Sequence, residues 1–130
     1  MTHPRYRPPD PSKGDESTIG GYAAVHDRPA AFEGSDGVSY SVEIMTGQTG
    51  DATQPWGAFF LFVKWARIGS QSPEGHLESD FLTQASTEAD ARALLGAAPL
   101  SAVKVLLDEL IAARRDPASR PWWDVRRDET

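Results

Sequence analysis

Hydrophobic residues are concentrated in one stretch of the chain, Trp56–Arg67, which reads WGAFFLFVKWAR. From Ala58 to Val63 the residues are almost all aromatic or aliphatic, and Gly57 and Gly69 flank the run. A run this short is typical of a buried strand, because a helix of the same length would be marginal and Phe and Val pack well on a pleated surface. We therefore predict that a central strand forms here.

Side-chain alternation divides this strand into two faces. One face is wholly apolar and is predicted to point into the core: Phe59, Leu61, Val63 and Trp65. The opposite face carries Phe60, Phe62, Lys64 and Ala66. Because full burial of a Phe side chain contributes ~1.5–3 kcal/mol, we expect a chain terminus or a second subunit to cover Phe60 and Phe62. These two residues are therefore candidates for an interaction surface.

The clearest alternation between an apolar and a mainly polar set of residues, with the period of two that a strand has, lies in Val38–Met45. Val38, Tyr40, Val42 and Ile44 alternate there with Ser39, Ser41, Glu43 and Met45. The preceding Gly34–Gly37 segment (GSDG) contains glycines that tolerate positive φ, so we predict a hairpin between Tyr22–Glu33 and Val38–Met45. Pro29 interrupts the first strand, and Tyr22–Val25 is expected to pair only at the sheet edge.

Two consecutive helices are predicted in the second half of the chain. The first covers Ser86–Leu95, where Ser86 or Thr87 can cap the helix and Gly96 ends it. The second begins at Pro99, a residue type suited to a first turn, and ends near Arg115. Its apolar residues fall in one stripe that is expected to pack on the sheet: Leu100, Val103, Leu106, Leu107, Leu110 and Ile111.

These elements predict a single α+β domain over residues 22–115, with an antiparallel meander sheet of three or four strands followed by two helices packed on one face. Residues 1–21 are rich in proline and charge and are predicted to be a disordered tail. Residues 116–130 form a second tail that carries Trp122 and Trp123. Disordered tails are poor in Trp, so this pair is expected to dock on the chain's own sheet, on a partner protein, or on a second copy by exchange.

The composition excludes several classes of function. The chain has 130 residues, a formal net charge of −6 and no cysteine, so disulfides, thiol nucleophiles and cysteine zinc sites are excluded. The acidic balance argues against a nucleic-acid footprint. The longest apolar run is too short to cross a bilayer, and the first twenty residues contain no apolar core of a signal peptide. We expect a cytoplasmic protein that binds neither nucleic acid nor membrane.

One pattern of side chains could support chemistry. If the segment after residue 75 is a strand, His76, Glu78 and Asp80 share one face, and an imidazole with two carboxylates could hold a divalent ion. If the segment is helical, Glu78 leaves the group. A solvated strand face explains the same residues without any metal. The polar loop Thr46–Pro55 is the segment expected near this group, although it lacks the Lys-Ser/Thr of a phosphate-binding loop.

The sequence therefore leads to two functional hypotheses. The first is a non-enzymatic protein-interaction module without a cofactor, which binds a protein partner or forms a homodimer through Phe60, Phe62, Trp122 and Trp123. The second is a small-ligand or divalent-metal-binding protein, including a hydrolytic enzyme, that uses His76, Glu78 and Asp80. The usual catalytic signatures, such as Gly-x-Ser-x-Gly, His-Glu-x-x-His and the dinucleotide fingerprint, do not occur in the chain.

Overall fold

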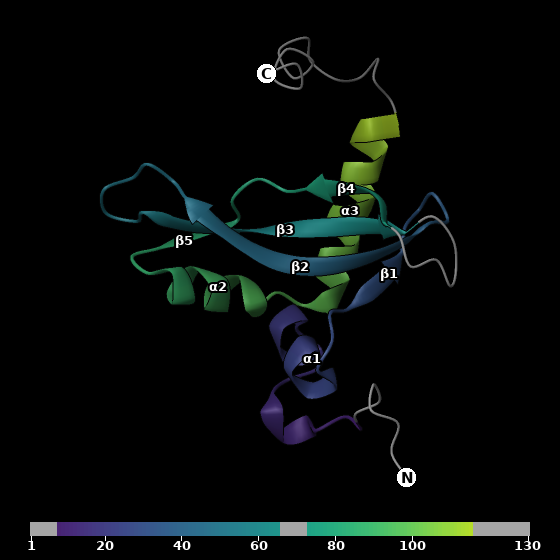
Figure 1. Ribbon diagram of the computed structural model, residues 1–130, viewed down its shortest axis with the longest axis horizontal. Helices are drawn as coiled ribbons and strands as arrows, with labels where there is room; N and C mark the ends of the chain where they lie inside the picture. Colours follow the sequence, from purple (N-terminus) through teal and green to yellow (C-terminus); the bar gives the residue numbers. More distant parts are fainter. Residues whose placement is uncertain (1–7, 66–72, 116–130) are drawn as a thin grey trace.

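The computed structural model describes residues 8–65 and 73–115 and confirms an α+β fold, in which helices pack on an antiparallel sheet (Figure 1). In chain order the elements are η1 (Pro11–Lys13), α1 (Ile19–His26), β1 (Ala31–Glu33), β2 (Ser39–Gln48), β3 (Trp56–Trp65), β4 (Pro73–Glu78), β5 (Thr83–Ala85), α2 (Glu88–Gly96) and α3 (Leu100–Arg115). The strands β1, β2, β3 and β4 form the predicted meander, and β5 adds a further strand beside β3.

The long hairpin of β2 and β3 forms the centre of the sheet. Its register is unbroken from Ser39↔Trp65 to Gln48↔Trp56. The predicted turn at Gly34–Gly37 is confirmed: Gly37 has φ +79°, and the Gly34 N–H donates to the Val38 carbonyl at 2.8 Å. The strand that enters this turn, β1, is only three residues long.

The prediction that Tyr22–Val25 forms a strand was wrong, because these residues belong to α1. Thr18 caps this helix through a hydrogen bond from the Gly21 N–H at 3.0 Å. The predicted disordered tail also ends earlier than residue 21, since Ile19 is buried in the core. Gly21 lets the segment before α1 pack closely on the helix, because a Cβ at this position would lie 1.8 Å from the Asp15 carbonyl oxygen.

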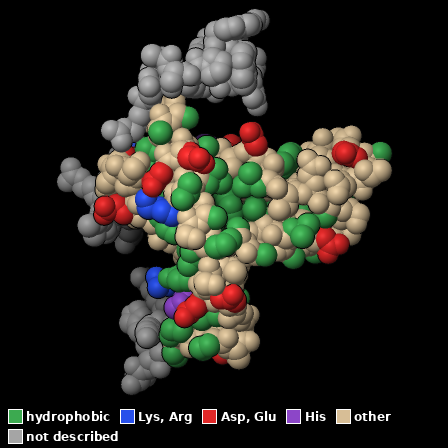
Figure 2. Space-filling model, turned by 180° about the vertical axis from the view of Figure 1, so that it is seen from behind, with side chains coloured by type: hydrophobic (Ala, Val, Ile, Leu, Met, Phe, Trp, Pro, Cys, Tyr) green, Lys and Arg blue, Asp and Glu red, His purple; other side chains and the backbone are tan. Residues whose placement is uncertain are grey.

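Both helices after the sheet occur where the sequence predicts them. Thr87 caps α2 by accepting from the Asp90 N–H at 3.1 Å, and the helix ends at Gly96. Figure 1 shows α3 passing behind the sheet, and Figure 2 shows the molecule from that side, with Asp and Glu side chains around a central group of hydrophobic ones. Helix α3 buries one stripe against the sheet: Val103, Leu107 and Ile111. The sheet is therefore packed on one side by α2 and α3.

The assignment of the two faces of β3 was inverted. Phe60 and Phe62 are 2% and 0% exposed and belong to the core, where their ring centroids lie 5.9 Å apart. The register pairs them with Ile44 and Val42, which share the helix-covered face. Phe60 and Phe62 therefore cannot form the predicted interaction surface. The helices themselves cover these two rings, and neither a chain terminus nor a second subunit is needed.

Candidate functional site

The face of the sheet opposite the helices, here called the open face, carries the alternate residues of β3. Its central column consists of Phe59, Leu61, Val63 and Trp65, each half-buried. In the described ranges 8–65 and 73–115, the helices lie on the other side of the sheet, against Phe60 and Phe62 (Figure 1). This apolar column is thus left without a covering layer from the described elements.

Polar side chains flank the apolar column on both sides. The register places the polar Ser39, Ser41 and Glu43 of β2 along one side, followed by the apolar Met45. His76 and Glu78 of β4 pair with Val63 and Leu61 on the other side. Trp65 is held in this arrangement by a hydrogen bond from its Nε1 to the Ser41 Oγ at 3.1 Å. An apolar centre with a polar rim is the usual anatomy of a protein–protein interface.

Phe81 extends the open face toward the loop that joins β2 and β3. Its ring meets Phe59 edge-on, with centroids 5.7 Å apart, and the side chain is 39% exposed. Glycines provide the space for this ring, because a Cβ at Gly57 would lie 2.5 Å from the Phe81 Cδ1 and one at Gly47 would lie 3.3 Å from its Cζ.

The candidate metal ligands do not come together as a group of three. His76 Nε2 and Glu78 Oε2 are 3.8 Å apart on β4, with side chains 60% and 53% exposed. Asp80 lies beyond the end of that strand. Within the part of the chain that the structure describes, no cluster of three or more His, Asp or Glu side chains could hold a metal ion.

The expected proximity of His76 to the Thr46–Pro55 loop was also wrong. His76 pairs with Val63, whereas β2 runs to Gln48, which pairs with Trp56, so the loop comprises only residues 49–55. Val63 and Trp56 are seven positions apart along β3, which corresponds to ~23 Å at the rise of a strand. The loop itself is organised by Asp51, whose carboxylate accepts from the Thr53 N–H at 2.8 Å.

The carboxyl groups with a shifted pKa have local structural partners. Hydrogen bonds from the Thr53 N–H and hydroxyl lower the pKa of Asp51. The pKa of Asp108 is lowered first by its hydrogen bond with Lys104, at 2.5 Å, and further by the Ser35 N–H at 2.9 Å. These contacts stabilise a loop and fasten the β1–β2 turn to α3. They supply no acid–base pair for catalysis.

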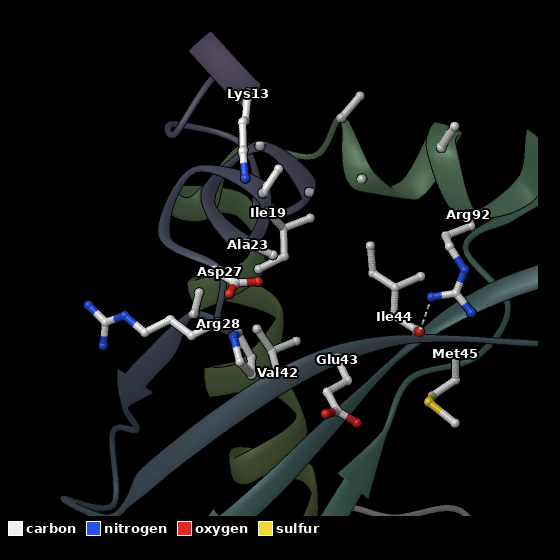
Figure 3. Close-up of a pocket in the computed structure, with 18 residues that line it drawn as sticks. Lys13, Ile19, Ala23, Asp27, Arg28, Val42, Glu43, Ile44, Met45 and Arg92 are labelled. Carbon is white, nitrogen blue, oxygen red and sulfur yellow. Dashed lines mark hydrogen bonds between the residues drawn. The ribbon is translucent and has the colours of Figure 1, made fainter. Parts of the chain in front are cut away.

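A large cleft opens at the edge of the sheet, between α1, α2 and the middle of β2 (Figure 3). Its volume is about 970 Å³, and β2 contributes Val42–Met45 to its lining. Much of the wall that the two helices provide consists of glycine and alanine: Gly20, Gly21, Ala23, Ala24, Ala93, Gly96 and Ala97. Charged residues also line it: Lys13, Asp27, Arg28, Glu43 and Arg92.

Sequence reasoning missed this cleft because it assigned the segment before Tyr22 to a tail. The available signal was the Ser17-Thr18 pair ahead of Ile19, a helix-capping pattern that the two glycines after Ile19 obscured. The remaining candidates, Trp122 and Trp123, lie outside the described residues.

Comparison of the chain with protein-family models, with curated proteins and with solved structures found no match. Among the helices that the structure describes, none is long and apolar enough to cross a membrane.

Proposed function

We propose that the protein is a non-enzymatic protein-interaction module that associates with a second copy of itself through the open face. The observation that carries this proposal is the apolar column Phe59–Leu61–Val63–Trp65 on a face without a described covering layer. Met45 and Phe81, at 37% and 39% exposure, lie next to Phe59 on the same face. A contiguous exposed apolar patch with a polar rim is characteristic of an interaction site.

A second copy suits this surface because it is one side of an antiparallel sheet. Two such sheets can stack face to face about 10 Å apart across a two-fold axis, so that each apolar column covers the other. The acidic Glu43 and the His76–Glu78 pair lie to either side of the column, where they remain hydrated after stacking. Trp122 and Trp123 are proposed as additional anchors, since Trp is enriched among residues that dominate binding energy.

The test is the absolute mass of the full chain in solution, by light scattering on a sizing column. We expect a dimer, and we expect Leu61→Glu to convert it to a monomer, because the substitution puts a charge in the centre of the apolar column. The matched control is Val105→Glu, which adds the same charge at a 59% exposed position on α3. A monomeric full chain, or a dimer that survives Leu61→Glu, would refute the open-face assignment.

Truncation after Asp116 separates the contribution of the Trp pair from that of the sheet. A dimer that persists without residues 117–130 depends on the open face alone. If the truncated chain is monomeric while Leu61→Glu in the full chain remains dimeric, the contact belongs to the Trp segment and not to the sheet.

The metal or hydrolytic alternative receives no such support. His76 and Glu78 form only an exposed pair, and no further ligand in the described ranges completes it.

A further inference from the structure

The strand β2 extends well beyond its outer neighbour β1. Strand β1 pairs with β2 only from Ser39 to Ser41, and one more bond follows, from the Val42 N–H to the Ala30 carbonyl at 3.0 Å. Past that point, no strand of the described chain pairs with the outer edge of Glu43–Gln48. The inner edge of the same residues is fully paired with β3. Six residues of β2 thus form a sheet edge of ~20 Å.

The backbone groups along this edge have a defined direction. Alternate residues of an antiparallel strand direct both their N–H and C=O to the same neighbour. Because the Val42 N–H points toward β1, the backbone groups of Ile44 and Thr46 point outward on the same side. The Ile44 carbonyl shows this directly, since it accepts from the Arg92 Nη1 at 2.7 Å (Figure 3). The guanidinium occupies the position that the N–H of an added strand would take.

The cleft described above lies alongside the first half of this edge, since β2 contributes Val42–Met45 to its lining. Side chains of an added strand would alternate between the open face and the helix side, and those on the helix side would enter the cleft. The alanines of α1 and α2 contribute only methyl groups to the lining there, and Ile19 and Ile44 supply further apolar surface. The cleft and the strand edge therefore form one continuous groove.

The edge has only part of the usual protection against strand pairing. Natural edge strands carry Lys or Pro, a bulge, or a covering element. Glu43–Gln48 contains neither Lys nor Pro, and its register with β3 is continuous. The Arg92 side chain covers the Ile44 carbonyl and must move aside for an added strand. An edge of this kind beside a large cleft suits the binding of an extended peptide by strand addition.

The charges of the lining restrict the chemistry of the peptide. Three cationic side chains, Lys13, Arg28 and Arg92, line the cleft against two carboxylates. In Figure 3 the Lys13 ammonium extends toward the cleft, and the Arg92 guanidinium lies over the β2 backbone. An acidic side chain on the peptide can pair with Lys13 or Arg92, whereas the Arg28 guanidinium points away from the cleft in Figure 3.

We propose that this groove binds an extended, acidic peptide segment of a partner protein as an added edge strand on Ile44–Gln48, with one bulky apolar side chain in the cleft. This surface is distinct from the open face, so the inference does not depend on the self-association proposed above. Affinity would come from main-chain hydrogen bonds and specificity from the cleft.

The test is a selection of displayed random decapeptides against the full chain, followed by binding measurements with the enriched peptides. Ala93→Trp fills the cleft from an exposed position of α2, and Ala102→Trp adds the same side chain at an exposed position of α3 outside the lining. We expect enriched peptides to combine an acidic residue with a bulky apolar one. They should bind the wild type and Ala102→Trp equally and bind Ala93→Trp at least tenfold more weakly.

Backbone N-methylation of the enriched peptides tests the mode of binding. Methylation at alternate residues should abolish binding, and the amide resonances of Ile44–Gln48 should shift on addition of the unmodified peptide. The proposal is overturned if no peptide is enriched, if Ala93→Trp binds as well as wild type, or if N-methylation has no effect. A change in the mass of the unliganded Ala93→Trp protein would also overturn it, because the groove would then hold a second copy of the chain.

Discussion

Substitution of Phe62 by Ala tests which face of the sheet is the core. The Phe62 side chain is fully buried and its ring lies 5.9 Å from that of Phe60. Removal of a buried Phe side chain costs ~3–5 kcal/mol, because the site loses both the transfer free energy and the contacts around the cavity. A domain of this size has a total stability of ~5–15 kcal/mol. Phe62→Ala should therefore remove a large share of the free energy of unfolding.

The matched variant is Leu61→Ala, at the adjacent position on the open face. Leu61 is half-buried, so its truncation should cost less than about 2 kcal/mol, below the value for a fully buried Leu. Urea unfolding followed by circular dichroism gives both values, and the midpoint of Phe62→Ala should fall by at least about 1 M. The wild type and both variants are compared at a concentration where they have the same oligomeric state, so that self-association does not contribute to the differences in the free energy of unfolding.

The result that would refute this reasoning is a loss of stability for Leu61→Ala that equals or exceeds the loss for Phe62→Ala. Such a result would mean that the helices pack on the face that carries Leu61. The assignment of the open face, and the proposed function with it, would then be wrong.

Further predictions address the other contacts of the fold. Gly21→Ala should lower the melting temperature, because its Cβ would lie 1.8 Å from the Asp15 carbonyl oxygen. Gly96→Ala should be tolerated, because the nearest atom to its Cβ would be the Gly20 Cα at 3.5 Å. Equal melting temperatures for the two variants would contradict this. Thr87→Ala should cost ~1 kcal/mol in urea unfolding through loss of the α2 cap; an unchanged midpoint would contradict it. Asp108→Asn should lower the melting temperature at pH 7.

The pH dependence of that last effect follows from the lowered pKa of Asp108. A carboxyl group whose pKa is lower in the folded state stabilises the fold above its unfolded pKa of ~3.9, and this contribution is lost as the pH falls through the folded value. The difference in melting temperature between wild type and Asp108→Asn should therefore narrow below about pH 4. A difference that stays constant from pH 7 to pH 3 would show that the ionised carboxylate is not responsible.

Local signals in the sequence were sufficient to predict the hairpin turn and the two helices after the sheet. The glycines of Gly34–Gly37 require a turn, Thr87 and Gly96 mark the ends of α2, and the apolar stripe of α3 has the helical period. Each of these features depends on residues close together in the chain. Their structure could therefore be predicted without knowledge of the tertiary packing.

The facing of β3 could not be determined in the same way, because both of its faces are apolar. The deciding information is the register with β2, which aligns Phe60 and Phe62 with Ile44 and Val42. Helix α1 was missed for a related reason. Glycine is unfavourable in an isolated helix, but Gly20 approaches Gly96 so closely that a Cβ at Gly20 would lie 3.0 Å from the Gly96 Cα. Long-range packing, which single-sequence patterns do not encode, determines both features.

The candidate metal group was judged from spacing alone, which placed three side chains on one strand face. The strand ends at Glu78, and Asp80 follows in the connection to β5. The cleft, in contrast, is formed by α1, α2 and β2, which are distant in the sequence. It becomes recognisable only when the fold brings these elements together.

Isotope-filtered nuclear Overhauser measurements test most directly whether a second copy of the chain covers the open face. The sample is an equal mixture of isotopically labelled and unlabelled full chain, in which only contacts between copies give a signal. We predict intermolecular contacts that join Leu61 and Val63 of one copy to Phe59 and Met45 of the other. Intermolecular contacts confined to α2 or α3, or none at a concentration where the chain is dimeric, would contradict the account.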